Sequence, residues 1–518
     1  MMSFPLPVLD SLEAITHQEN LHSRVTLYKG AAESDFDSCC QKLLEAGYEQ
    51  MEAYTQDTHR YAAFRMEDCG VFVNSYGAIH ELRIVQEAHC AYFDYADQPT
   101  KASTPPQLTQ LALEHFGMSY VIRLSDGRHI VIDGGRNIEA DCHKLFHRLK
   151  AETPFEKPVI AAWILTHPHS DHFHCFMGFM ELYAQEVTIE RFLFNFPEPD
   201  DYAHYPGLTE EGVRWDYDLR AITNVPIMLK WIEQTGAAVY MPHTGQRYAI
   251  GDARLEILSS MDDTIHLSQN VNATSLVIRM TLGGQVILWG TDAGFSYARL
   301  AERYGAFLKA DILQIPHHGL QSGTAEGELE AYAFIRPRIC LLPADDFFAY
   351  TFFCAYRPGT RSLMLSEETE AFFTGAQEHT LPLPYTPQKG IMQKVLQQFR
   401  QGQESAGARM WFFTGLSTAN PEDFVFTLIN TLIPTVTVRI DLYFEQKVHA
   451  IRDVQTEVTG SRMRFINLKE ELEKFNATSH TPGSFPEGQP FAVRFISDLP
   501  VVVAHEKHRA TMYHTVPV

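Results

Sequence analysis

Short apolar runs, each ended by a glycine or a polar turn, dominate the middle of the chain. The runs at 118–124 and 129–133 flank an Asp-Gly dipeptide, which predicts a β-hairpin. The run at 161–165 follows a segment at 141–150 that has the apolar spacing of a helix. Strands that alternate with helices in this way predict an α/β sandwich across residues 107–390.

The segment before this region has a pattern of its own. Residues 20–95 predict a small α+β unit that begins with a strand at 25–28. A helix is expected at 35–46 and should end at Gly47, because glycine readily adopts the left-handed conformation that terminates helices. The polar, proline-bearing stretch 97–106 is typical of a linker.

The C-terminal segment alternates apolar and polar positions at 435–444, which is the pattern of a half-buried strand. Further runs of strand type lie at 463–466, 491–496 and 500–503. Strands separated by turn residues predict a β-sandwich. The chain is therefore expected to be of the α/β class and to have three domains, at 1–106, 107–390 and 391–518.

The composition limits the partners and the compartment. The 518 residues include 42 Lys and Arg against 64 Asp and Glu, a net charge of −22. A field of this sign favours a small-molecule substrate over nucleic acid, although it does not exclude a local basic groove. The eight cysteines form no C-x-x-C pair, and neither a secretory signal nor an apolar run of membrane-spanning length is present. We expect a cytoplasmic protein with free thiols and no membrane contact.

A dense set of metal-ligand side chains follows the apolar run at 161–165. His167, His169, Asp171 and His172 form an H-x-H-x-D-H pattern. Neutral imidazole nitrogens and carboxylate oxygens are the ligands that zinc and similar ions take. Incidental histidines in a polar loop are the alternative, because the chain has 24 of them. Four such ligands in six positions favour a metal site.

Two later strands end in residues that could complete this site. The apolar run at 286–289 leads to Asp292, and a second run at 312–315 leads to the pair His317-His318. A carboxylate at a strand end can lie between two cations, although an aspartate that caps a turn is the alternative. The side chains of adjacent histidines diverge, so only one of the pair needs to be a ligand.

Taken in order, these segments resemble the metallo-β-lactamase superfamily of hydrolases. The features that carry the resemblance are Val131-Ile132-Asp133-Gly134-Gly135, the loop at 167–172, Gly290-Thr291-Asp292 and Pro316-His317-His318-Gly319. The resemblance covers residues 107–390 and implies an αββα sandwich. The most similar subgroup includes the soluble domain of the DNA-uptake competence channel and phosphocholine esterases. Its marks are the strand that begins at Asn272 and the paired-His-Gly motif.

The resemblance also implies a role for each of these side chains. His167 and His169 are expected to bind a first ion. Asp171, His172 and His318 are expected to bind a second ion, with Asp292 as the bridge between the two. Asp171 would also orient the nucleophile. His317 is expected to face the substrate as a hydrogen-bond donor or general acid, and Asp133 to steady the ligand loop from behind.

One ligand that many members of this superfamily have is not evident in the sequence. The histidines between the loop and Asp292 are His204, His243 and His266, and none follows a convincing strand. Water or Asn272 would then complete the first site, and Ser275 lies on the same segment as a further second-shell or substrate-binding candidate. We expect two divalent ions, zinc in the first place and manganese or iron as alternatives.

The activity implied by the resemblance is hydrolysis by a metal-bound hydroxide at a dinuclear site. The subgroup favours a phosphodiester or phosphomonoester substrate. Lactones, thioesters and amides are alternatives because the same centre serves them. Two further alternatives are a di-iron redox enzyme, since iron takes the same ligands, and a non-catalytic sensor or scaffold.

The last hundred residues resemble the sensory rhodopsin transducer family. The residues that carry this resemblance are those at 428–430, 440–444, 463–465 and 495–505, above all the Ser-Asp-Leu-Pro-Val-Val-Val run. The resemblance implies a β-sandwich that serves oligomerisation, including a homo-oligomer, or ligand binding. An accessory sandwich that covers the hydrolase is the alternative.

Overall fold

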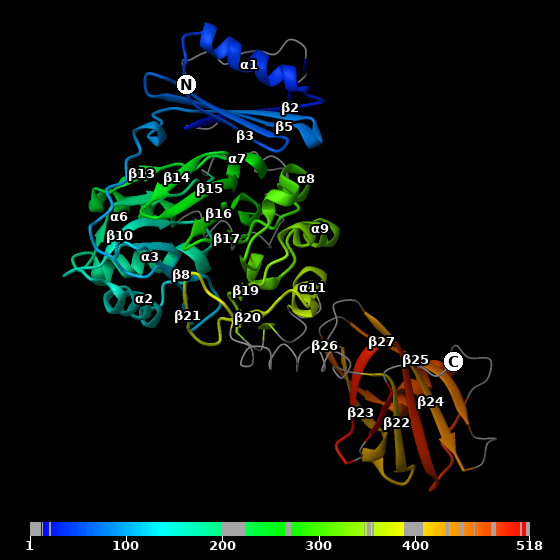
Figure 1. The fold of residues 1–518 in the computed structure, drawn as a ribbon. Helices are drawn as coiled ribbons and strands as arrows, with labels where there is room; N and C mark the ends of the chain where they lie inside the picture. Colours follow the sequence, from blue (N-terminus) through cyan, green and yellow to red (C-terminus); the bar gives the residue numbers. More distant parts are fainter. Residues whose placement is uncertain are drawn as a thin grey trace. The chain divides into compact units, whose positions relative to one another are not determined.

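The computed structural model forms two compact units, Met1–Ala349 with Arg357–Met392, and Tyr350–Tyr356 with Gln393–Val518 (Figure 1). The domain boundary expected at 106 lies inside the first unit. The structure describes residues 12, 14–19, 22–197, 224–264, 271–345, 348–349, 354, 357–387, 408–430, 435–445, 450–459, 462–477, 483–507 and 510–513.

Two mixed sheets form the centre of the first unit. The first has the order β13-β12-β10-β9-β8-β7-β21, with β11 also paired to β10. Its strands are β7 (Gln107–Gln110), β8 (Ser119–Arg123), β9 (His129–Asp133), β10 (Val159–Ile164), β11 (Thr188–Ile189), β12 (Arg191–Leu193), β13 (Ala238–Tyr240) and β21 (His379–Pro382). The hairpin expected around the Asp-Gly turn is β8 paired antiparallel with β9.

The second sheet has the order β14-β15-β16-β17-β18-β19-β20. Its strands are β14 (Arg247–Ile250), β15 (Ala253–Ser259), β16 (Val277–Leu282), β17 (Gln285–Trp289), β18 (Ile312–Gln314), β19 (Ile339–Leu342) and β20 (Ala371–Thr374). From β17 to β20 the strands run parallel, so their carboxyl ends meet at one edge of the sheet.

Apolar side chains from both sheets meet in one buried core. Ile132 and Ile164 of the first sheet share this core with Ile278, Ile287 and Trp289 of the second. The outer face of the first sheet carries α2 (Glu139–Glu152), α3 (Ser170–Tyr183) and α6 (Val225–Thr235) in a separate apolar cluster. On the side of the second sheet lie α8 (Leu300–Tyr304), α9 (Ala325–Ile335) and α11 (Pro358–Leu365) (Figure 1). This αββα layering confirms the fold class expected from the sequence.

The N-terminal part is an antiparallel sheet with one helix on its face. The order is β1-β2-β6-β5-β4-β3. The elements are β1 (Ala14–Glu19), β2 (Ser23–Lys29), α1 (Glu33–Glu45), β3 (Glu49–Gln56), β4 (His59–Met66), β5 (Cys69–Tyr76) and β6 (Glu81–Glu87). Leu43 of α1 packs with Phe64 and Val73 of the sheet. Gly47 has a φ of 94° just beyond α1, as expected for a helix terminator.

Buried charges join this N-terminal sheet to α7 (Met261–Thr264) and α8 of the sandwich. Arg303 donates from Nη2 to Glu81 Oε1 at 2.8 Å and from Nη1 to Asp263 Oδ1 at 3.1 Å. Arg83, fully buried, also pairs with Glu81 and Asp263. Breaking a buried ion pair from one side is costly, so the N-terminal sheet is tied into the first unit by more than apolar contact.

His243 belongs to this junction. Its Nδ1 atom lies 2.5 Å from Asp262 Oδ2 and its Nε2 atom 3.2 Å from Glu87 Oε2, while its ring stacks on Phe72. Burial disfavours the imidazolium, but Asp262 and Glu87 outweigh that effect and raise the pKa of His243 to about 10. The protonated ring therefore stabilises the junction at neutral pH.

Raising the pH should weaken this junction. Because the folded pKa of His243 is raised above the unfolded value of about 6.5, its stabilisation is complete below that value and is lost as the pH rises through about 10. We expect the free energy of unfolding to fall between about pH 7 and pH 10 by up to ~1.4 kcal/mol per pH unit. His243→Gln should remove that part of the slope in urea unfolding, whereas His147→Gln, a change at an exposed histidine of α2, should not. Equal slopes in His243→Gln and wild type would contradict the assignment.

The second unit is a β-sandwich. Its elements are β22 (Ala408–Ser417), β23 (Val425–Asn430), β24 (Val436–Phe444), β25 (Ile451–Val458), β26 (Arg462–Asn467), α13 (Leu468–Asn476), β27 (Pro490–Ala504) and β28 (Ala510–Tyr513). The runs at 491–496 and 500–503 belong to one strand, β27, and not to two. Its first part pairs with β22 and β24, and its last part pairs with β23, so it passes from one sheet to the other.

Among the described residues, no helix is both long and apolar enough to cross a membrane.

Candidate metal centre

The H-x-H-x-D-H loop leaves the carboxyl end of β10, a strand buried between neighbours on both sides. It turns at once into α3, whose first residues are Ser170, Asp171 and His172. His167 and His169 therefore lie in the turn, whereas Asp171 and His172 lie in the first helical turn. Asp171 there is also favoured by the positive end of the helix dipole.

Asp133, at the end of β9, anchors this loop from below. Its carboxylate accepts hydrogen bonds from the Thr166 backbone N–H at 2.8 Å and from the Thr166 hydroxyl at 2.7 Å. The Nδ1–H of His172 donates to the same carboxylate at 2.7 Å. Asp133 is fully buried and has a φ of 54°, a left-handed conformation that aspartate tolerates better than most residues. Asp133 thus lies behind the loop and holds it through three hydrogen bonds.

These bonds also orient three imidazoles. The Thr166 hydroxyl donates to Asp133, so it can only accept from Nδ1 of His167, which lies 3.2 Å away. The Nδ1–H of His318 donates to the backbone carbonyl of Pro343 at 2.9 Å. With Nδ1 of His167, His172 and His318 held by these partners, Nε2 is the nitrogen of each ring that is left to bind a metal ion. Hydrogen bonds to the ring nitrogen that faces away from the ion fix which nitrogen can act as the ligand in metal sites.

Asp292 and His318 arrive from the ends of β17 and β18 in the second sheet. The parallel pairing of these strands places both residues at the same edge. The turn between β17 and Asp292 is held by Thr291, whose N–H donates to the Gln314 side chain at 2.5 Å and whose carbonyl accepts from the His317 N–H at 2.7 Å. A strand end of each sheet therefore contributes to one site.

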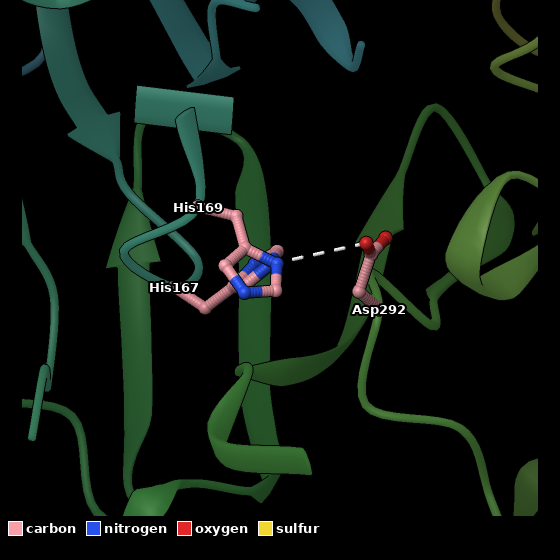
Figure 2. Close-up of side chains that lie close together, drawn as sticks. All are labelled: His167, His169 and Asp292. Carbon is pink, nitrogen blue, oxygen red and sulfur yellow. Dashed lines mark ion pairs between the residues drawn. The ribbon is translucent and has the colours of Figure 1, made fainter. Parts of the chain in front are cut away.

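Six side chains form two neighbouring groups in which the potential ligand atoms lie within 4.8 Å of one another. The first group is His167, His169 and Asp292, and the second is Asp171, His172 and His318. Figure 2 shows the two histidines of the first group on one side and the carboxylate of Asp292 on the other. All six side chains are buried.

Asp292 borders both groups. Its Oδ2 atom lies 3.8 Å from His167 Nε2, 3.2 Å from His172 Nε2 and 3.5 Å from His318 Nε2. The Nε2 atoms of His172 and His318 are 3.3 Å apart, and His318 Nε2 is 3.4 Å from Asp171 Oδ2. The Nε2 atoms of these three histidines thus surround one small volume that the carboxylates of Asp171 and Asp292 also border.

Two polar atoms in this volume indicate that the site fits a cation. Among the described residues, His167 Nε2 and Asp292 Oδ1 are buried and have no hydrogen-bond partner. Leaving such atoms unsatisfied inside a protein costs about 1–3 kcal/mol each. A metal ion would satisfy both, and two histidines with one carboxylate form a common donor set for zinc and iron.

The electrostatics of the site also favour a bound cation. Burial opposes ionisation of Asp292, but His172 and His318 outweigh it and hold the pKa of Asp292 well below its usual range. Burial likewise opposes protonation of His318, but Asp292 and Asp171 raise its pKa to about 9. Burial, together with His172 and His169, holds the pKa of His167 well below its usual value. The centre therefore keeps its carboxylates ionised and favours positive charge between them.

His317 lies outside both groups. Its Nε2 atom is 3.0 Å from the side-chain amide of Asn272, and its Nδ1 atom is 2.8 Å from the Ser322 hydroxyl. The backbone N–H of Ser322 donates to Glu328 Oε1 at 2.6 Å. Asn272 is thus beside His317, at the rim of the centre.

The remaining sequence candidates lie elsewhere. The Ser275 hydroxyl donates to the backbone carbonyl of Asn272 at 2.7 Å, so it stabilises a turn. His243 is in neither ligand group and lies in the charged junction described above. His204 and His266 are outside the described residues.

Sequence reasoning missed three partners of the centre. Ser322 contacts His317, and the carbonyl of Pro343 orients His318. The Ser322 side chain stands in no recognisable motif, and a carbonyl carries no sequence signal. The aromatic ring of Phe116, centred 3.9 Å from that of His318, was also not expected.

Residues 113–253 match the family model described as the metallo-beta-lactamase superfamily. The chain contains a metallo-β-lactamase domain. This confirms the resemblance drawn from the motifs, and the matched range includes the H-x-H-x-D-H loop but ends before Asp292 and His318. No curated protein sequence matches the chain.

Solved structures that are similar to parts of this chain include the following three. A metallo-beta-lactamase fold protein, YhfI from Bacillus subtilis, is 18% identical over 46% of this chain and 85% of its own, with a TM-score of 0.28. CmlA, a diiron beta-hydroxylase from Streptomyces venezuelae, is 12% identical over 68% and 79%, with a TM-score of 0.29. The Anabaena sensory rhodopsin transducer is 19% identical over 20% and 83%, with a TM-score of 0.16.

Proposed function

We propose that the metallo-β-lactamase domain is a metal-dependent hydrolase that cleaves a phosphoester, either a phosphodiester or a phosphomonoester. The observation that carries the proposal is the position of Asp292, whose Oδ2 atom lies within 3.8 Å of an imidazole nitrogen from each ligand group. Two neighbouring cation sites suit displacement at phosphorus, because paired cations stabilise both the attacking and the leaving oxygen.

The chain's own residues divide the work as follows. His167 and His169 would hold one ion, Asp171, His172 and His318 would hold the other, and Asp292 would contribute to both. Two divalent ions there, zinc or alternatively manganese or iron, would supply hydroxide at neutral pH and polarise the bond that is cleaved.

The surrounding residues position these ligands and the reacting groups. Asp133 fixes the tautomer of His172 by accepting from Nδ1, and Pro343 does the same for His318. Asp171 orients the nucleophile through its carboxylate. His317 would face the substrate as a hydrogen-bond donor or general acid, which requires the Asn272 amide to move away from its Nε2 atom while Ser322 keeps Nδ1.

One observation favours a second candidate. The first group consists of two histidines and one carboxylate, which is also the donor set of non-haem iron oxygenases. A di-iron redox enzyme would use the same side chains. Lactones, thioesters and amides are the other hydrolase substrates to compare, because the ligand set alone does not select among them.

Metal analysis and a substrate screen test the proposal together. Purified protein should contain close to two ions per chain and hydrolyse bis(nitrophenyl) phosphate or nitrophenyl phosphate faster than lactone or thioester probes. Turnover of lactones alone would reject the phosphoester assignment. Iron with an oxygen-dependent optical spectrum, and no hydrolysis, would favour the redox candidate.

His169→Ala should separate metal-dependent turnover from contamination. Removing this imidazole from the first group should lower the metal content by about one ion and kcat by ~10²-fold or more. His147→Ala, at an exposed position of α2, serves as the matched control and should retain both. Full activity and two ions in His169→Ala would show that the first group is wrongly assigned.

A further inference from the structure

A cavity of about 470 Å³ lies beside the second ligand group. Phe116 and Pro343 line it and also contact His318, the first through its ring and the second through its carbonyl. The adjoining Gly117, also in the lining, precedes Met118, whose N–H donates to the carbonyl of Asp171 at 3.0 Å. The cavity and the candidate centre therefore share a wall.

The lining combines an apolar surface with few charges. Its large apolar side chains are Leu111, Leu113, Phe116 and Phe348. The ionisable residues of the lining are Glu114, His115, Arg136 and Asp345. Glu114 is neutralised by Lys144, whose Nζ lies 2.7 Å away, and Asp345 is exposed and accepts a hydrogen bond from the Phe348 N–H.

Arg136 is the cation of this lining, and it is held in place. Its Nε–H donates to the backbone carbonyl of Phe116 at 3.1 Å, which fixes the guanidinium on the cavity wall. No carboxylate of the described residues forms an ion pair with it. Arg128, by contrast, is fully buried and pairs with Asp97, Asp126 and Glu190. Within the described part of the chain, the terminal nitrogens of Arg136 thus remain available to an anion, which the net charge of −22 would otherwise repel.

We propose that this cavity binds the part of the substrate next to the bond that is cleaved, and that this part has an apolar body and an anionic group held by Arg136. The apolar body lies against Phe116 and Leu113, and the guanidinium forms charge-assisted hydrogen bonds with a carboxylate, sulfonate or phosphate. The assignment to a substrate rests on the proposed hydrolase function, but the binding property itself does not. An anionic group held in this way would make Arg136 a determinant of substrate class.

Two fluorescent probes of nearly the same shape test the binding property on the metal-loaded protein. Anilinonaphthalene sulfonate has an apolar body with an anion, and phenylnaphthylamine has the same body without it. Arg136→Gln should weaken binding of the sulfonate by about tenfold or more and leave the neutral probe within about twofold. Arg123→Gln is the matched control, because Arg123 also binds a backbone carbonyl, that of Pro105, but is not in the lining. Circular dichroism checks that both variants fold.

The outcomes separate this inference from the proposed function. Equal sulfonate binding in Arg136→Gln, Arg123→Gln and wild type would overturn the inference, even if phosphoesters are hydrolysed. A selective loss in Arg136→Gln would support it, even if no phosphoester is hydrolysed. If the protein is active, a carboxyphenyl nitrophenyl phosphate should exceed phenyl nitrophenyl phosphate in kcat/KM by about tenfold, and Arg136→Gln should abolish that preference. A preference that survives the substitution would also count against Arg136.

Discussion

Asp292→Asn is expected to cause the largest loss of activity of any single change in this chain. The substitution keeps the shape of the side chain but removes the negative charge beside His167, His172 and His318. Because the carboxylate borders both ligand groups, both should lose affinity for their ions. We expect a metal content well below one ion per chain after dialysis, and a fall in kcat/KM of at least ~10³-fold.

The stability of this variant should also fall in the absence of metal. Asp292 is buried, and His172 and His318 hold its pKa well below the usual range, so at neutral pH it is a buried anion. Asparagine removes the cost of burying that anion, but the loss of its ion pairs with His172 and His318 outweighs this gain, because those pairs already outweigh burial in setting the pKa of Asp292. Metal content by mass spectrometry, kcat/KM and thermal unfolding with and without chelator measure these effects separately.

A surface carboxylate provides the control for Asp292→Asn. Asp252 is exposed and accepts a hydrogen bond from the Ser125 N–H at 3.0 Å, away from both ligand groups. Asp252→Asn changes the net charge by the same amount and should retain full metal content and turnover. If Asp292→Asn also retained two ions, Asp292 would not belong to the centre.

The parts of the centre that the sequence predicts are those in which chemistry coincides with a strand end. His167, His169 and Asp292 each follow a buried apolar run. An apolar strand followed by a metal-ligand residue can therefore be recognised in the sequence alone. The choice between His317 and His318 could not be made this way. It depends on the turn after β18, in which both residues have positive φ and only His318 Nδ1 reaches the Pro343 carbonyl.

His243 shows why an isolated histidine is ambiguous. It follows β13 and lies between the loop and Asp292 in sequence, as a ligand of the first ion would. In the structure it pairs with Asp262 and with Glu87 of the N-terminal sheet. The contact between His243 and Glu87 joins residues far apart in the sequence, so no local strand or turn pattern predicts it.

The continuous strand β27 has a similar explanation. Residues 491–496 and 500–503 are separate runs of strand type in the sequence, and the second begins at Pro500, which cannot donate a ladder hydrogen bond. The strand changes partners near that position, from β22 and β24 to β23, so the missing donor falls where the ladder itself changes. The propensity of proline predicts a break in the strand at residue 500. The strand is nevertheless continuous because β27 pairs with neighbours on both sides of this position.

Asp133→Asn should show that the carboxylate below the loop supports both folding and metal binding. The native carboxylate accepts three hydrogen bonds, two from Thr166 and one from His172 Nδ1. An amide in its place can accept through one oxygen only, and its NH₂ group would face a donor. We expect the free energy of unfolding to fall by about 2–4 kcal/mol, because buried donors lose their partners. Metal affinity should fall ~10–100-fold, as for other changes behind a ligand histidine.

Asp133→Asn needs a matched control because Asp133 has a φ of 54°. A substitution at a left-handed position can change the free energy of unfolding through the backbone alone. Asp57 has nearly the same φ, 53°, but is exposed in the turn between β3 and β4. Asp57→Asn should therefore leave stability and metal affinity unchanged. Urea unfolding gives the first quantity and competition with a chromogenic chelator the second. If Asp133→Asn lost stability but bound metal as tightly as wild type, the bond to His172 would be structural only. A loss of both, with the neutral imidazole of His172 no longer fixed at Nδ1, is the result expected from a residue that sets the ligand nitrogen.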